Sequence, residues 1–237
     1  MVQAALNNRG YAIRRIDHCN VLQYLLHTMV RRTGKVSLVQ IGANDGRMAD
    51  PLYEFVRLYP ASVQGLVVEP ISDYFDRLKV HYATCPGIKP VRVAIHHSQE
   101  TMTMYRVDAT RAPGLPRFAA GIASFDPTHY QRSGIPAEAI VDEQVPCRTL
   151  GGLLQEHGLN ELDLLQIDTE GYDAEILRAI DFSRHRIHVI RFEHGRFNSM
   201  SKSDFVELRG KLRDHGYDIM IEPRDATAYL PSTVLDL

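Results

Sequence analysis

Residues 39–52 read VQIGANDGRMADPL, and this stretch decides which fold the chain can adopt. It begins with an apolar run typical of a buried β-strand, and Gly42 and Gly46 then enclose a short polar turn. An Asp-Pro pair at residues 50–51 is typical of the start of a helix. A strand that ends in a glycine-rich turn and continues as a helix presents bare backbone to a ligand. We therefore expect a ligand site where this strand ends.

Strand and helix patterns alternate along the rest of the chain. The candidate strands are residues 36–41, 63–68, 90–95, 163–167, 187–192 and 217–221, and the candidate helices begin near residues 15, 51, 73, 150, 172 and 204. Apolar strands that alternate with helices predict an α/β fold, in which a mostly parallel sheet is covered by helices on both faces. Within this pattern, we expect Ser203 to open the last of these helices.

The pattern divides the chain into an N-terminal helical segment, residues 1–34, and one α/β domain, residues 35–237. Residues 99–148 interrupt the alternation, because they combine one strand-like run, TMTMYRV, with a long stretch that has no helical pattern. Long irregular insertions in compact domains are usually functional. We expect this insertion to form a hairpin and a loop over the mouth of the site.

Composition excludes several classes of protein. The net charge of −2 and the pI near 6.6 lack the basic character of a nucleic-acid binder. Three cysteines without C-x-x-C spacing suggest neither a disulfide framework nor a zinc site, and reduced thiols point to the cytoplasm. No apolar run is long enough to span a membrane, and no signal peptide is evident. The assembly is left open, with a homodimer as one option.

The ligand should lie outside the carboxyl ends of the strands. The G-x-G-x-x-G and P-loop motifs are both missing, which disfavours a diphosphate ligand and a nicotinamide oxidoreductase. Glu69 ends the second candidate strand, where a carboxylate can accept hydrogen bonds from the two hydroxyls of a ribose. An acidic residue and a glycine turn without a phosphate cradle indicate a nucleoside that lacks phosphates. S-adenosylmethionine is the obvious candidate.

Five motifs resemble the FkbM family of S-adenosylmethionine-dependent methyltransferases. They are IGANDG at 41–46, VVEP at 67–70, ASFD at 123–126, LLQIDTEGYDAEIL at 164–177 and IRFEH at 190–194. The resemblance implies a Rossmann-like class I methyltransferase fold with a seven-stranded sheet, and O-methylation of a sugar, a polyketide or another small molecule. Many family members have lysine where this chain has Gln166, so any role of that charge is absent or moved.

The expected cofactor site gathers the residues at the strand ends and in the insertion. We expect Asp45 to attract the ammonium group of S-adenosylmethionine, and a side chain at Gly42 or Gly46 to occupy the space of the ligand. The expected cofactor-binding residues are Gln40, Gly42, Asn44, Asp45, Gly46, Glu69, Pro70, Ala94, Ser124 and Asp168.

The expected catalytic residues are Asp168, Glu170 and His194. Asp168 and Glu170 follow the fourth candidate strand, and His194 follows the fifth together with Glu193. Two schemes remain open. In the preferred one, His194 is the general base and a carboxylate orients it. In the other, Asp168, Glu170 and Glu193 hold Mg²⁺, which acidifies the acceptor hydroxyl. His129 of the insertion could also reach the acceptor.

Two other functions are weighed against a methyltransferase for small molecules or carbohydrates. An enzyme that methylates nucleic acid would need a basic groove, and the net charge argues against one. A non-catalytic module that binds S-adenosylmethionine remains an alternative, because fold and cofactor binding alone do not establish catalysis.

Overall fold

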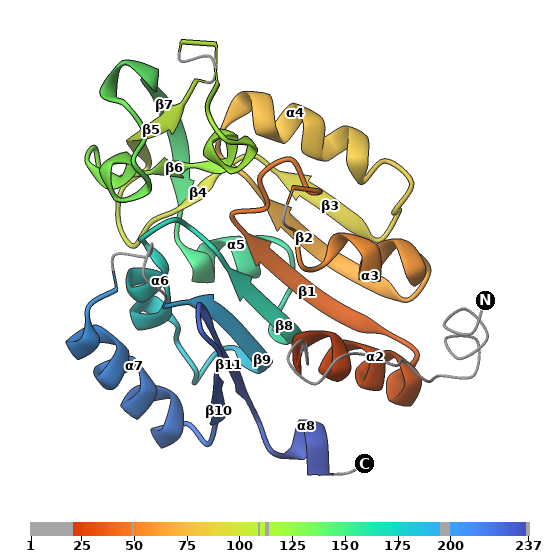
Figure 1. Cartoon of the computed structure of the whole chain (residues 1–237). Coiled ribbons are helices and arrows are strands. Elements are labelled where there is room, and N and C mark those ends of the chain that lie inside the picture. The colour runs from red at the N-terminus through yellow and green to blue at the C-terminus, as the bar shows by residue number, and fades with distance from the viewer. Residues whose placement is uncertain (1–20, 49, 109, 112–113, 195–199, 236–237) are drawn as a thin grey trace.

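The computed structural model describes residues 21–48, 50–108, 110–111, 114–194 and 200–235. Its centre is a seven-stranded sheet with the strand order β10-β11-β9-β8-β1-β2-β3 (Figure 1). Five strands of this sheet are parallel: β1 (Val36–Ile41), β2 (Val63–Val68), β3 (Ile88–Val91), β8 (Glu161–Ile167) and β9 (Arg186–Glu193). The hairpin of β10 (Asp218–Ile221) and β11 (Asp225–Tyr229) adds an antiparallel edge. The expected α/β fold with a mostly parallel, seven-stranded sheet is confirmed.

Helices cover both faces of this sheet. The period-two alternation of β1 explains how, because Leu38 and Val39 belong to two different hydrophobic cores. Leu38 packs with residues of α2 (Val21–Thr33), α3 (Tyr53–Leu58) and α4 (Ser72–His81). Val39 packs with residues of α5 (Leu150–Glu156), α6 (Asp173–Ala179) and α7 (Lys202–Asp214). Within the described ranges, no helix is both long and apolar enough to cross a membrane.

Three expectations about individual elements need correction. The expected strand 90–95 is divided, because the chain leaves the main sheet after Val91 and β4 (Ala94–Ile95) pairs with a strand of the insertion. Helix α7 begins after Ser201, not Ser203, since Ser201 and Asp204 form a reciprocal capping box. The edge strand β11 has no counterpart among the expected strands.

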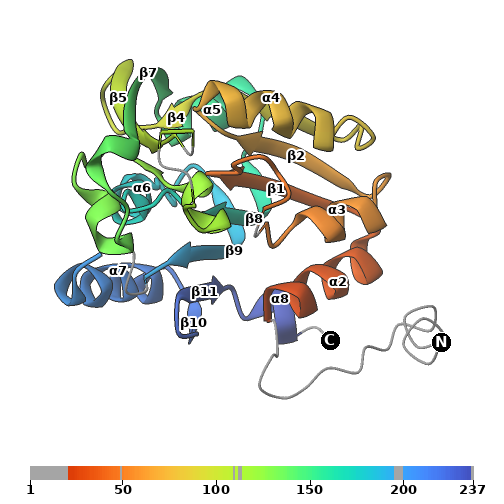
Figure 2. The same ribbon diagram turned by 45° about the horizontal axis from the view of Figure 1, so that its top comes forward.

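The insertion and β4 together form a second, four-stranded sheet with the order β4-β7-β5-β6. Strand β5 (Thr101–Val107) pairs antiparallel with β7 (Ile140–Arg148) and with the short β6 (Ala123–Ser124). Three 3₁₀ turns complete it: η2 (Arg117–Gly121), η3 (His129–Ser133) and η4 (Ala137–Ala139). In both views the insertion lies at the end of the main sheet toward which β1 and β8 point (Figures 1 and 2). It therefore covers the carboxyl ends of the parallel strands.

Candidate active site

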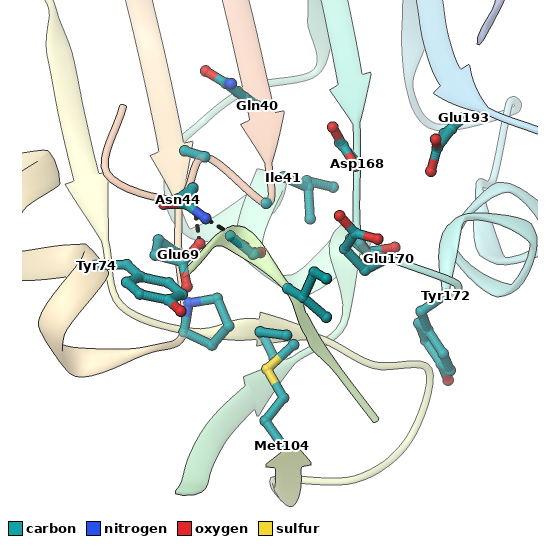
Figure 3. Close-up of a pocket in the computed structure, with 18 of the residues that line it drawn as sticks. Gln40, Ile41, Asn44, Glu69, Tyr74, Met104, Asp168, Glu170, Tyr172 and Glu193 are labelled. Carbon is teal, nitrogen blue, oxygen red and sulfur yellow. Dashed lines mark hydrogen bonds between the residues drawn. The ribbon is translucent and has the colours of Figure 1, made fainter. Parts of the chain in front are cut away.

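A cavity of about 560 Å³ lies between the carboxyl ends of β1, β2 and β8 and the insertion. This volume is within the usual range for sites that bind small molecules. Figure 3 shows Asn44, Glu69 and Tyr74 on one side of the cavity and Asp168, Glu170 and Glu193 on the other. Of the expected site residues, the lining includes Gln40, Gly42, Asn44, Glu69, Pro70, Ala94, Asp168, Glu170 and Glu193.

The two glycines of the first turn serve close packing. Gly42 and Gly46 have φ values of +81° and +74°, a region that side chains disfavour. A Cβ atom on Gly42 would lie 1.7 Å from the carbonyl oxygen of Asp168, and one on Gly46 would lie 2.5 Å from Leu78. The expectation that a side chain at these positions would mainly occupy ligand space is therefore wrong, because it would first meet the protein itself.

The turn between the glycines is held by its polar residues. The backbone N–H of Asn44 donates to Glu69 over 2.8 Å, and its side-chain amide donates to the carbonyl of Gly121 in the insertion over 3.3 Å. Asp45 accepts hydrogen bonds from the backbone N–H groups of Arg47 and Met48. Asp45 is not among the lining residues, so its expected role toward an ammonium group is not supported by this geometry.

Glu69 joins the glycine turn to the second strand. Its two carboxylate oxygens accept hydrogen bonds from the backbone N–H groups of Asn44 and Ile71, each over 2.8 Å. The residue is only 4% exposed, and burial raises its pKa to about 7 against the lowering effect of these two hydrogen bonds. Each oxygen retains a lone pair with which it can accept a further hydrogen bond.

Two buried polar atoms of the cavity wall lack partners. Among the described residues, neither the side-chain oxygen of Gln40 nor the hydroxyl of Tyr74 has a hydrogen-bond partner. The side chain of Gln40 also acts on Asp50, where it lowers the pKa of the carboxyl against the larger raising effect of burial. Buried polar groups are rarely left unsatisfied, so both atoms are suited to contact a polar ligand.

Gln166 lies beside Gln40, on the neighbouring strand β8. On its other side, Gln166 is in register with Arg191 of β9, whose guanidinium binds Glu222 and Asp225. A positive side chain is therefore present one strand away from Gln166, and it is already neutralised by two carboxylates.

Asp168 is the first residue after β8 and is open to the cavity. Desolvation by burial raises the pKa of Asp168 well above its ordinary value. The negative charges of Glu170, Asp173 and Glu193 raise it further. No side-chain hydrogen bond of Asp168 to another described residue is formed. A carboxylate with a raised pKa and a free face is suited to exchange protons near neutral pH.

Asp173, which the sequence reasoning did not single out, orders the ends of β8 and β9. One carboxylate oxygen accepts from the N–H and hydroxyl of Thr169, and the other accepts from the N–H of Glu193 over 3.0 Å. Its place inside the IDTEGYD motif is a signal that could have identified it. Asp173 thus fixes the spacing between Asp168 and Glu193.

His194 is not a lining residue, which argues against its expected role as general base. Its Nε2 atom lies 3.0 Å and 3.1 Å from the carbonyl oxygens of Glu222 and Asp225, and its ring stacks on Phe205. Carbonyl oxygens only accept, so Nε2 carries a proton and donates it there. His194 joins β9 to the β10–β11 hairpin and to α7.

The alternative metal site also lacks support. Asp168, Glu170 and Glu193 all line the cavity, but the described part of the chain contains no group of three or more His, Cys, Asp or Glu side chains placed to hold a metal ion. The three carboxylates are therefore better described as separate polar groups around one cavity.

The insertion supplies further residues to the site that the sequence did not identify individually. Met104, Phe118, Ile122 and Arg132 line the cavity, and Phe118 is 58% exposed at its mouth. Ser124, an expected cofactor residue, is not in the lining; its hydroxyl instead donates to the carbonyl of Glu170 over 2.8 Å. No local sequence pattern shows which residues of an irregular segment face a cavity.

Comparisons with known proteins agree with this architecture. A family model described as "Methyltransferase FkbM domain" matches residues 40–219. No curated protein matches the sequence.

Solved structures that resemble the chain share little of its sequence. The "METTL16 MTase domain" is 13% identical with a TM-score of 0.49, covering 92% of this chain and 69% of that one. Precorrin-6y C5,15-methyltransferase from Geobacter metallireducens GS-15 is 13% identical with a TM-score of 0.44, covering 94% and 96%. Aeropyrum pernix fibrillarin, solved with natively bound S-adenosyl-L-methionine, is 11% identical with a TM-score of 0.40, covering 82% and 65%.

Proposed function

Because the chain belongs to the FkbM methyltransferase family, we propose that it uses S-adenosylmethionine to methylate a hydroxyl group of a small molecule or carbohydrate. The observation that carries this proposal is the cavity itself. It joins a buried, hydrogen-bonded acid at the end of β2 to an open acid at the end of β8. The acid at the end of β2 is suited to bind a nucleoside, and the acid at the end of β8 is suited to proton transfer.

The residues present fit a nucleoside cofactor. Glu69 would accept hydrogen bonds from the ribose hydroxyls, because both of its oxygens are already fixed by backbone N–H groups. The unpartnered hydroxyl of Tyr74 and the apolar surface of Pro70 and Met104 would surround the adenine base. The unpartnered oxygen of Gln40 would accept from the ammonium group. When bound, S-adenosylmethionine supplies a methyl group on a positively charged sulfur.

Asp168 would act as the general base for the acceptor hydroxyl. It is open to the cavity, and its raised pKa makes its ionised form a stronger base than an ordinary carboxylate. Glu170, which lines the cavity from the same turn, would accept a hydrogen bond from the acceptor and orient it. Turnover should rise with pH through the raised pKa of Asp168, because only the ionised carboxylate can take the proton.

The mouth of the cavity favours an acceptor with a ring and several hydroxyl groups. Phe118 offers an exposed aromatic face, while Glu170 and Glu193 offer carboxylates that accept hydrogen bonds from hydroxyls. A sugar or a hydroxylated natural product combines these two features.

The test is to incubate purified protein with methyl-labelled S-adenosylmethionine and fractionated cell extract. We expect the label to appear in a small molecule or glycan fraction. Asp168→Asn should lower the rate of labelling by roughly 10²–10⁴-fold, since an amide cannot take the proton. Glu156→Gln, an exposed change on α5, is the matched control and should leave the rate unchanged. Binding of the cofactor without labelling of any fraction would favour the non-catalytic alternative.

A further inference from the structure

His129 of the insertion is a buried histidine in direct contact with the active-site turn. Its side chain is 2% exposed, and its Nε2 atom lies 3.0 Å from a carboxylate oxygen of Glu170. The two residues are 41 positions apart in sequence, so the contact joins the insertion to the residues that follow β8. Burying a histidine against a carboxylate that opens to a cavity is costly unless both groups are well paired.

The second ring nitrogen determines which tautomer of His129 is present. Nη1 of Arg132 lies 3.3 Å from Nδ1 of His129, and Arg132 is itself paired with Asp126 over 3.2 Å. A guanidinium group can only donate hydrogen bonds, so Nδ1 accepts. The ring proton is therefore on Nε2, where it is donated to Glu170.

The backbone of Glu170 is held from the same segment. Its φ of +52° lies in the left-handed region, which is unfavourable for a residue with a side chain. The hydroxyl of Ser124 donates to the carbonyl oxygen of Glu170 over 2.8 Å and thereby stabilises this conformation. Two residues of the insertion thus hold Glu170, one by its backbone and one by its carboxylate.

We propose that His129 is a positioning residue for Glu170, whose carboxylate it holds toward the acceptor by donating from Nε2. The consequence for turnover rests on the function proposed above, in which Glu170 orients the acceptor hydroxyl. The hydrogen bond itself does not rest on that function. Because His129 and Ser124 both belong to the insertion, the insertion completes the acceptor side of the site as well as covering it.

The hydrogen bond is tested by nitrogen-15 NMR of histidine-labelled protein, alone and with S-adenosylhomocysteine. The His129 signals are assigned by their loss in His129→Gln. We expect one neutral tautomer with the proton on Nε2, and ring shifts that change in Glu170→Gln. Glu138→Gln, an exposed change in η4 of the same insertion, should leave them unchanged. A proton on Nδ1, or shifts that are the same in Glu170→Gln as in wild type, would overturn the proposal.

A double-mutant cycle then separates positioning from a purely structural role. His129→Ala should lower the rate of methyl labelling about tenfold, and His129→Ala combined with Glu170→Gln should be no slower than Glu170→Gln alone. His129→Gln retains a donor and should recover part of the rate. Affinity for S-adenosylhomocysteine, measured by calorimetry, should remain within about twofold of wild type in all variants.

The outcomes of the two experiments are distinguishable. Additive losses in the double mutant would overturn the positioning role, because His129 would then act independently of Glu170. If the wild-type protein transfers no methyl group at all, the proposed function fails, and the NMR experiment alone decides whether His129 holds Glu170.

Discussion

At the scale of single residues, Glu69 shows how one side chain can serve the fold and the ligand together. Its carboxylate ties the glycine turn to the chain after β2, and it lies in the wall of the cavity. Burial raises the pKa of Glu69 to about 7, so its carboxyl group changes charge near neutral pH. A free carboxylate elsewhere on the surface would titrate far below this range.

We therefore expect cofactor affinity to depend on pH through Glu69. The ionised carboxylate accepts hydrogen bonds from ribose hydroxyls, so affinity for S-adenosylhomocysteine should fall about tenfold from pH 8 to pH 6 as the competent fraction decreases. Calorimetric titrations at both pH values measure the change. Glu69→Gln should bind more weakly at pH 8 and lose most of the pH dependence. A wild-type affinity that is constant over this range would contradict the assignment.

The same raised pKa has a consequence for folding. Because the native pKa of Glu69 is higher than that of the unfolded chain, its stabilising contribution is present at low pH and is lost as the pH rises through about 7. Glu69→Gln should therefore flatten the dependence of unfolding free energy on pH between about 4.5 and 7. Urea denaturation at several pH values measures this.

Gly42 provides a second test at this scale. Gly42→Ala should reduce the unfolding free energy by about 3 kcal/mol or more, because the new Cβ would collide with the backbone of Asp168. Gly158→Ala is the matched control: Gly158 has a φ of +66° but no atom within 4 Å of a Cβ, so only about 1 kcal/mol of backbone strain is expected. Equal losses in denaturant titrations would contradict the close approach of Gly42 to Asp168.

At the scale of elements, the insertion is fastened to α4 by Glu143 of β7. One oxygen of this carboxylate accepts from the N–H and hydroxyl of Ser72 and the other from Arg106, whose guanidinium also reaches Asp73. Burial acts to raise the pKa of Glu143, but the hydrogen bonds from Ser72 and the interaction with Arg106 outweigh it and hold the pKa below its usual value. Hydrogen bonds and ion pairs therefore hold the second sheet against α4, beside the cavity.

Glu143→Gln should lower the unfolding free energy by about 1–3 kcal/mol at neutral pH, since it removes one of the two carboxylates that pair with the partly buried Arg106. A lowered native pKa contributes stability above the unfolded pKa that is lost as the pH falls through the native value. The difference between variant and wild type should therefore shrink in acid, which thermal denaturation at pH 7 and pH 3 would show. Asp142→Asn, an exposed neighbour on β7, is the control and should change little.

At the scale of the whole molecule, the strand order brings distant residues to one edge. Strands β1 and β8 are neighbours although more than 100 residues separate them, so Gly42 and Asp168 lie in contact. All the parallel strands end at this edge, and the insertion closes it (Figures 1 and 2). A ligand bound here contacts several elements at once and should stabilise the complete fold.

S-adenosylhomocysteine at about 100 times its dissociation constant should add about 2.7 kcal/mol to the stability of the native protein. For a domain of this size, that corresponds to a rise in melting temperature of roughly 5–10 °C. Differential scanning fluorimetry measures the shift, with NAD at the same concentration as the control. A larger shift with NAD would contradict the proposed cofactor.

The sequence by itself determined most of the parallel strands of the main sheet and the edge at which the site lies. Strands 36–41 and 63–68 are found with the expected bounds, because apolar residues predominate in both stretches and glycine or proline residues flank them. The polar residues after each strand then have to meet at one edge, since parallel strands end on the same side. This is why Glu69 and Asp168 could be placed from sequence alone.

Only the tertiary structure decided which polar residues turn toward the cavity. Glu193 and His194 are neighbours in sequence, yet Glu193 lines the cavity and His194 binds the β10–β11 hairpin. Successive side chains leave an extended backbone on opposite sides. The elements packed around the strand decide which of these sides faces the cavity. The contact of His129 with Glu170 was likewise hidden, because packing rather than a local period places residues of an irregular insertion.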